Sequence, residues 1–271
     1  MRKAFLLGVA CVLLGGCASR GADPAMRDAA GGELAIDQGI CSRVAEVPDR
    51  KLSKTERLAE LHAALGAGYL QEGALDIALR ELEESLKFDS RSASAHATMA
   101  LLQLRLSKPA LAAEHYQRAL ALSPSDPEIR NNYGVFLCGQ GSWKEADAQF
   151  RCALANPLYR TPALAYTNAA ECALRHGSDG RAETDLLTAI QLDPGYATSS
   201  LLLAELLLKK GDARGARGHL ERYVRRSGST PAGLALGIRV ETAMGDLDRA
   251  ASYRLLLKNQ FPDSREAQEL H

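Results

Sequence analysis

The sequence predicts an all-α solenoid built from six helix–turn–helix repeats. Alanine recurs at spacings of 34, 34, 36, 34 and 34 residues, at Ala78, Ala112, Ala146, Ala182, Ala216 and Ala250. Five residues before each alanine lies a glycine or, once, a serine, at Gly73, Ser107, Gly141, Gly177, Gly211 and Gly245. The hydrophobic share of 46% is dominated by Ala and Leu, which favour helix over sheet. A fixed period of this length is the signature of a repeat protein.

The first residues are predicted to be a targeting signal and not part of the solenoid. A cationic start, Met1 to Lys3, precedes an apolar run of eleven residues, Ala4 to Leu14. As a helix this run would rise about 16 Å, roughly half of a bilayer core, which is typical of a signal peptide. The run ends in LGGC, which resembles the bacterial lipobox. We therefore expect residues 1–16 to be a signal peptide and Cys17 to be acylated. The alternative is an ordinary cleavable signal with an incidental cysteine.

The segment after Cys17 is predicted to be a lipidated flexible tether. Residues 17–52 are rich in Ala, Gly and Asp and show no sustained period. About 35 such residues have a root-mean-square reach near 30–35 Å. Two or three acyl chains hold a protein firmly on a membrane. Ala18 follows the cysteine in place of the Asp that often marks inner-membrane retention, so we expect the periplasmic face of the outer membrane.

The repeats are predicted to occupy residues 53–264. Ser53 and Glu56 have the spacing of a capping box, which marks the first helix start. The units begin near residues 59, 93, 127, 163, 197 and 231, and residues 265–271 remain as a C-terminal tail. The two extra residues of the 36-residue spacing fall at 158–162, where we expect a loop.

The repeat resembles the tetratricopeptide repeat (TPR), in which two antiparallel helices span 34 residues. The third unit matches its signature best, with Tyr133, Gly134, Leu137, Ala146 and Phe150. The resemblance implies a superhelical solenoid in which each hairpin packs on its neighbours. It also implies a concave groove, lined by the first helix of each unit, that binds peptides or protein segments.

The composition and motifs indicate no nucleic-acid-binding, metal-binding or catalytic site. Lys plus Arg and Asp plus Glu both number 33, and this zero formal charge argues against nucleic-acid binding. The six histidines form no zinc-binding motif, and His62 and His96 share one repeat position that is typical of structural packing. No nucleophile elbow or phosphate loop occurs. We therefore expect no enzyme activity, no cofactor, no metal and no small-molecule substrate.

The groove is the predicted functional site. In TPR units it is lined by the second, fifth, ninth, twelfth and thirteenth residues. Applied here, this register selects Leu70, Leu101, Leu104, Arg105, Asn131, Val135, Thr167, Glu171, Leu174, Arg175, Glu205, Leu208 and Lys209. The early positions are apolar, which suits an anchor from a partner helix, and the later ones carry both signs of charge. The alternative is that some of these leucines pack between repeats.

The cysteines predict a disulfide between repeats three and four. Cys138 and Cys172 both lie late in the first helix of adjacent units, and neighbouring helices pack about 8–10 Å apart. Such a gap allows the Cα separation that a disulfide needs. Cys152 is expected to be a buried free thiol in the second helix of repeat three, and Cys41, in the tether, has many positions within reach.

Two segments resemble a known family more specifically than the repeat does. These are the run NNYGVFLC from Asn131 to Cys138, and Pro157-Leu158-Tyr159 followed by Asn168 and Cys172-Ala173. They resemble the type IV pilus biogenesis/stability lipoproteins of the PilF/PilW family. The resemblance implies an outer-membrane pilotin that helps the pilus secretin localise and multimerise. The alternatives are a TPR lipoprotein adaptor in outer-membrane barrel assembly or cell-wall remodelling, and a cryptic enzyme.

Overall fold

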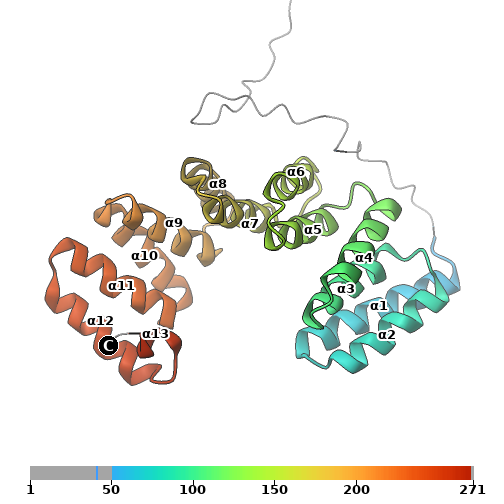
Figure 1. Cartoon of the computed structure of the whole chain (residues 1–271), viewed down its shortest axis with the longest axis horizontal. Helices are drawn as coiled ribbons and strands as arrows, with labels where there is room; N and C mark the ends of the chain where they lie inside the picture. Colours follow the sequence, from blue (N-terminus) through green and yellow to red (C-terminus); the bar gives the residue numbers. More distant parts are fainter. Residues whose placement is uncertain (1–40, 42–50, 270–271) are drawn as a thin grey trace, which may run out of the picture. The chain divides into compact units, whose positions relative to one another are not determined.

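The computed structural model describes residue 41 and residues 51–269, and every regular element in that part of the chain is helical. The helices pair in sequence as antiparallel hairpins, one per predicted repeat (Figure 1). Their bounds are Lys54–Glu72 (α1), Leu75–Phe88 (α2), Ala93–Arg105 (α3), Pro109–Leu122 (α4), Pro127–Gly139 (α5), Trp143–Leu154 (α6), Pro162–Arg175 (α7), Asp179–Leu192 (α8), Ala197–Lys209 (α9), Ala213–Ser227 (α10), Pro231–Met244 (α11), Leu247–Gln260 (α12) and Arg265–Gln268 (α13).

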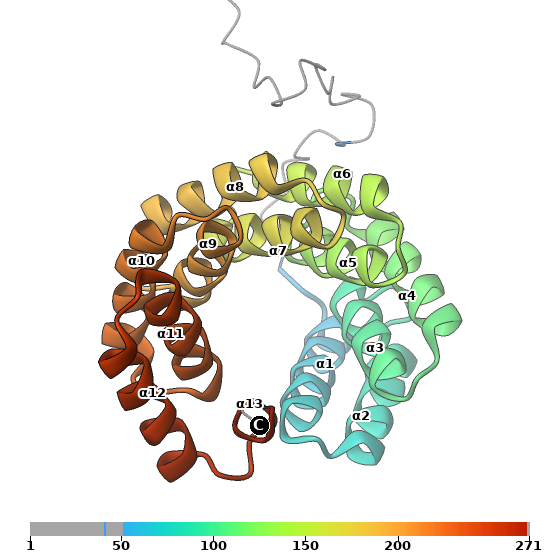
Figure 2. The same ribbon diagram turned by 60° about the vertical axis from the view of Figure 1, so that its left-hand side comes forward.

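The hairpins stack so that their helices form two layers, which Figure 2 shows. The odd-numbered helices α1 to α11 make up one layer, here called the A layer, which lies on the inside of the array in that view. The even-numbered helices α2 to α12 make up the B layer on the outside. Each hairpin packs on the next, with α5 against α7 and α6 against α7. The predicted all-α TPR solenoid is therefore confirmed.

The recurring alanines lie where the two helices of each hairpin come closest. Five of the six are fully buried, and Ala250 is 3% exposed. A glycine in the first helix allows the same close approach from the other side. A Cβ at Gly134 would lie only 2.7 Å from the Phe150 ring of α6, which is closer than carbon atoms pack. The small residues of the repeat thus set the distance between the layers.

The glycines before the alanines are explained by the backbone of the turns. Gly73, Gly141, Gly177, Gly211 and Gly245 all have positive φ, between 74° and 86°. A side chain is strained in that region, so glycine is favoured there. The sixth position, Ser107, adopts the same turn with φ of 57°. The same turn therefore occurs in all six repeats, and Ser107 adopts the positive-φ conformation that is strained for a residue with a side chain.

The ends of the array follow the sequence with one difference. The predicted capping box is present, since Ser53 Oγ accepts from the Glu56 backbone N–H and the Glu56 carboxylate accepts from Ser53 N–H. Residues 265–268, predicted to lie in a tail, instead form α13. Its Ala267 packs on Leu234 and Leu257 of the sixth repeat and so covers part of that repeat's core. The signal peptide, Cys17 and most of the tether lie outside the described residues.

The two inserted residues lie in a loop between α6 and α7, as predicted. Tyr159 of this loop is buried against Ala153 and Ala165, while Leu158 is exposed.

Within the described residues, no helix is both long and apolar enough to cross a bilayer.

Candidate functional site: the exposed face of the A layer

The side chains at the ninth position of successive repeats form a row on the exposed side of the A layer. We call this the ninth-position row and define it as Leu101 of α3, Val135 of α5, Glu171 of α7, Glu205 of α9 and Arg239 of α11. Arg239 was not selected from the sequence, although the register of the sixth unit points to it. The row is apolar at its N-terminal end and charged at its C-terminal end, as the sequence predicted.

The apolar end of the row is open to solvent. Leu101 is 36% exposed and Val135 is 47% exposed. Leu104 lies beside them but is partly packed against the core of Ala100, Tyr116 and Phe136. Arg105, at the end of α3, is exposed. Two aliphatic side chains on adjacent helices therefore offer contact area without belonging to the core.

Leu70 does not belong to this face, so the sequence-based assignment is wrong there. It is only 7% exposed and packs with Leu82, Met99 and Leu102 between the first and second repeats. The twelfth position turns toward the neighbouring hairpin, whereas the ninth, about one turn earlier, remains outside. Of the leucines selected from the sequence, Leu70 is the one that packs in the core.

Asn131 and Thr167, also selected as groove residues, are buried and serve the joints between repeats. The Asn168 amide donates to Asn131 Oδ1 at 3.0 Å, which links α7 to α5. Thr167 Oγ1 lies 2.8 Å from Ser199 Oγ and donates to the Ala163 carbonyl within its own helix. Because buried polar groups need partners, these pairs fix the register of adjacent helices and are unavailable to a ligand.

The charged end of the face carries ion pairs. The Arg175 guanidinium donates to Glu171 at 2.6 Å, and Lys209 donates to Asp179 at 2.7 Å. Burial raises the pKa of Glu205, and the nearby positive charge of Arg239 opposes that rise. Leu174 and Leu208 are partly buried against the cores of their repeats. This end therefore presents both signs of charge, on exposed side chains such as Arg175 and Lys209 and on the more buried Glu205.

Two disulfides tie the middle of the array. The structure joins Cys138 of α5 to Cys172 of α7, the pairing that the repeat register predicts, with Cα atoms 5.8 Å apart. It also joins Cys41 to Cys152 of α6, with Cα atoms 5.1 Å apart. Cys152 is therefore not the free thiol expected from the sequence. A residue ahead of the first helix reaches the third repeat, which spacing alone does not reveal because the partners lie 111 residues apart.

An ion-pair network strengthens the same joint in the B layer. Arg151 of α6 donates to both carboxylate oxygens of Asp185 in α8, at 2.9 and 2.5 Å. Asp147 of α6 accepts from Arg151 at 3.1 Å and from Arg181 of α8 at 2.5 Å. Repeats three and four are thus linked by a disulfide in one layer and by ion pairs in the other.

The histidines at the shared repeat position take part in packing between the helices of a hairpin. His62 Nδ1 lies 2.7 Å from the Glu81 carboxylate, and His96 Nδ1 lies 3.0 Å from His115 Nδ1. Burial lowers the pKa of both His96 and His115, which favours the neutral rings that such a pair requires. These contacts agree with the structural role expected for His62 and His96.

Comparison with known proteins places this architecture in a family. The tetratricopeptide repeat family matches residues 63–127, 97–157 and 167–233. The type IV pilus assembly protein PilF of Pseudomonas aeruginosa is 32% identical over 210 residues, covering 78% of this chain and 83% of PilF.

Solved structures agree with the sequence relationship. The structure of Pseudomonas aeruginosa PilF has a TM-score of 0.72 at 31% identity, and the match covers 80% of this chain and 98% of the PilF chain in that structure. The crystal structure of PilW, a widely conserved type IV pilus biogenesis factor, has a TM-score of 0.73 at 29% identity, covering 79% of this chain and 98% of PilW. The chain therefore belongs to the PilF/PilW family of TPR proteins of type IV pilus biogenesis.

Proposed function

We propose that this protein is an outer-membrane lipoprotein that binds a protein partner on the A layer and acts as a pilotin. In this role it assists the pilus secretin to localise and to multimerise, and it catalyses no reaction. The observation that carries the proposal is the ninth-position row, where exposed aliphatic side chains are followed by charged ones. An amphipathic segment that buries an apolar anchor and pairs its charges suits such a row. Its relatives' part in type IV pilus biogenesis supports the secretin as the partner.

The partner surface is tested by placing charge at its apolar end. Replacing Leu101 and Val135 by Glu is expected to weaken co-purification of the secretin by about tenfold or more, because a partner's apolar anchor would face carboxylates. Secretin multimers in outer-membrane fractions should fall in parallel. Helical circular dichroism should stay unchanged, since both side chains are exposed.

A matched control uses Leu111 of α4 and Leu187 of α8, which are equally exposed but lie in the B layer. Their replacement by Glu should leave secretin binding intact. If the B-layer variant loses binding and the A-layer variant keeps it, the proposed surface is wrong. Co-purification of barrel-assembly components in place of a secretin would support the adaptor alternative.

The membrane anchor has a separate test. Cys17→Ser is expected to abolish acylation, so the protein should leave the outer-membrane fraction or remain unprocessed. The physical reason is that no thiol remains to carry acyl chains, and a helix that spans the bilayer is absent from the described residues. Sucrose-gradient fractionation and intact-mass measurement give the result, with Ser19→Ala as the matched control. Normal processing and outer-membrane fractionation of Cys17→Ser would disprove the lipobox.

A further inference from the structure

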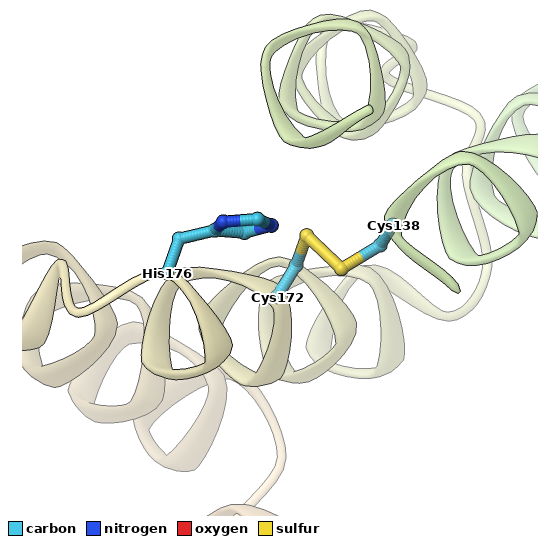
Figure 3. Close-up of side chains that lie close together, drawn as sticks. All are labelled: Cys138, Cys172 and His176. Atoms are coloured by element: carbon cyan, nitrogen blue, oxygen red, sulfur yellow. A yellow bond between two sulfur atoms is a disulfide. The ribbon is translucent and has the colours of Figure 1, made fainter. Parts of the chain in front are cut away.

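Three potential metal ligands meet at the joint between repeats three and four. The sulfur atoms of Cys138 and Cys172 and a ring nitrogen of His176 lie within 4.8 Å of one another. Figure 3 shows the imidazole beside the disulfide, extending over the same side of α7 as Cys172. The two cysteines are buried, whereas His176 is exposed at the helix end. The group is therefore reachable from solvent through the histidine.

The helical register explains why these residues converge. Cys172 and His176 are four residues apart at the end of α7, a spacing that places two side chains on one face of a helix. The same spacing lets two residues of one helix bind a single metal ion. Cys138 approaches from α5, with its Cα atom 5.8 Å from that of Cys172. Two adjacent repeats thus supply ligands to one point.

The His176 ring is held in place by an aromatic contact and not by hydrogen bonds to other described residues. Its ring contacts Trp143 of α6, with ring centroids 5.5 Å apart. Trp143, His176 and Cys172 line one pocket, together with Asp147 and Arg181 of the ion-pair network. Among the described residues, no hydrogen bond to the His176 ring is present, so its nitrogens remain available as ligands.

We propose that Cys138, Cys172 and His176 form a Zn²⁺ site when their disulfide is reduced. A dithiol supplies two electrons and two protons, so the S–S bond breaks, two thiols form and the dithiol becomes a disulfide. Zn²⁺ then displaces the two thiol protons to solvent and binds two thiolates and the neutral imidazole. Water completes the tetrahedron, as in other zinc sites with three protein ligands.

The geometry requires little movement to reach this state. Two thiolates on one zinc ion lie about 3.7 Å apart at Zn–S distances near 2.3 Å. The Cα atoms of Cys138 and Cys172 are 5.8 Å apart, a separation from which rotation about the Cα–Cβ bonds can bring the two sulfur atoms to this spacing. The bound ion would connect α5 to α7, so the joint keeps a covalent or coordinate link in both redox states.

The test uses the full-length protein, reduced with a phosphine under anaerobic conditions and titrated with Co²⁺ and then Zn²⁺. We expect one Co²⁺ per chain, with the thiolate charge-transfer band and the intense visible bands of a tetrahedral site. Zn²⁺ should bleach these bands by displacement and raise the melting temperature of the reduced protein, since it binds only the folded state. Absence of these bands in the reduced wild-type protein would overturn the proposal.

Matched variants distinguish this site from other thiols. Removing a metal ligand costs at least as much as removing a group that orients one, so His176→Gln should weaken Zn²⁺ binding by at least about 100-fold. His219→Gln, at a half-buried histidine of α10, and the double variant Cys41→Ala/Cys152→Ala should bind Zn²⁺ like the wild type. Equal affinity of His176→Gln and wild type, or loss of binding in Cys41→Ala/Cys152→Ala, would also overturn the assignment.

Discussion

Removing the Cys41–Cys152 disulfide is expected to lower the free energy of unfolding of the first three repeats by about 5 kcal/mol. The bridge closes a loop of 111 residues that contains α1 to α5 and most of α6, and the chain-entropy estimate grows with loop length. The variant is Cys41→Ala/Cys152→Ala, so that no free thiol remains to exchange. Urea unfolding of the oxidised protein gives the result. Trp143, the single tryptophan, reports on repeat three, and circular dichroism reports on the whole array.

Two comparisons isolate the effect of the covalent link. In the presence of a phosphine, the wild type and the variant should unfold at nearly the same urea concentration, because neither then holds the bridge. The Cys138–Cys172 disulfide closes a loop of only 34 residues, so its removal in Cys138→Ala/Cys172→Ala is expected to cost about 4 kcal/mol. If the oxidised variant and the oxidised wild type show the same Trp143 transition, the bridge does not stabilise these repeats.

Replacing Arg151 by Met is expected to cost about 3–5 kcal/mol, because it leaves a buried carboxylate without its partner. The Arg151 side chain is 15% exposed and that of Asp185 is 6% exposed, so water cannot replace the missing charge. Burial by itself lowers the pKa of Arg151, but hydrogen bonds and charge from Asp185, with a smaller contribution from Asp147, outweigh that effect and raise the pKa above its usual value. Urea unfolding followed at Trp143 measures the cost.

A double variant distinguishes the cost of leaving Asp185 without its partner from the net contribution of the Arg151–Asp185 pair to stability. Arg151→Met/Asp185→Leu removes both charges and should recover most of the stability, since apolar residues of similar volume often replace a buried pair without loss. Arg175→Met breaks the exposed pair with Glu171 and should cost less than about 1 kcal/mol. A cost for Arg151→Met no greater than for Arg175→Met would contradict the expected effect.

The helices could be predicted because their signals are local. The repeat positions of Ala146 and Gly134 need small residues because the two helices of a hairpin approach closely there. The repeat position of Gly141 needs a residue that tolerates positive φ because the chain turns there. Each requirement recurs with every hairpin, so the sequence shows it six times. The exchange of glycine for serine at Ser107 does not disturb the pattern, because the surrounding hairpin imposes the turn.

The surface was harder to predict because burial depends on the neighbouring repeat. Leu70 and Leu101 both belong to the positions expected to line the groove, yet the first lies in the core and the second is exposed. Side chains of the second hairpin, among them Met99 and Leu102, cover Leu70. The same dependence holds for Asn131, whose partner Asn168 lies in the next unit.

The sequence by itself determined the repeat, the approximate start of each unit, the direction from apolar to charged along the face, and the Cys138–Cys172 pairing. All of these follow from the spacing of residues within one or two units, where helix geometry converts sequence distance into position. Only the tertiary structure decided that Cys41 pairs with Cys152, that His176 joins the cysteine pair, and that Arg151 spans to Asp185. Those contacts depend on how the hairpins stack and on the position of Cys41 against the third repeat, and no local periodicity encodes either.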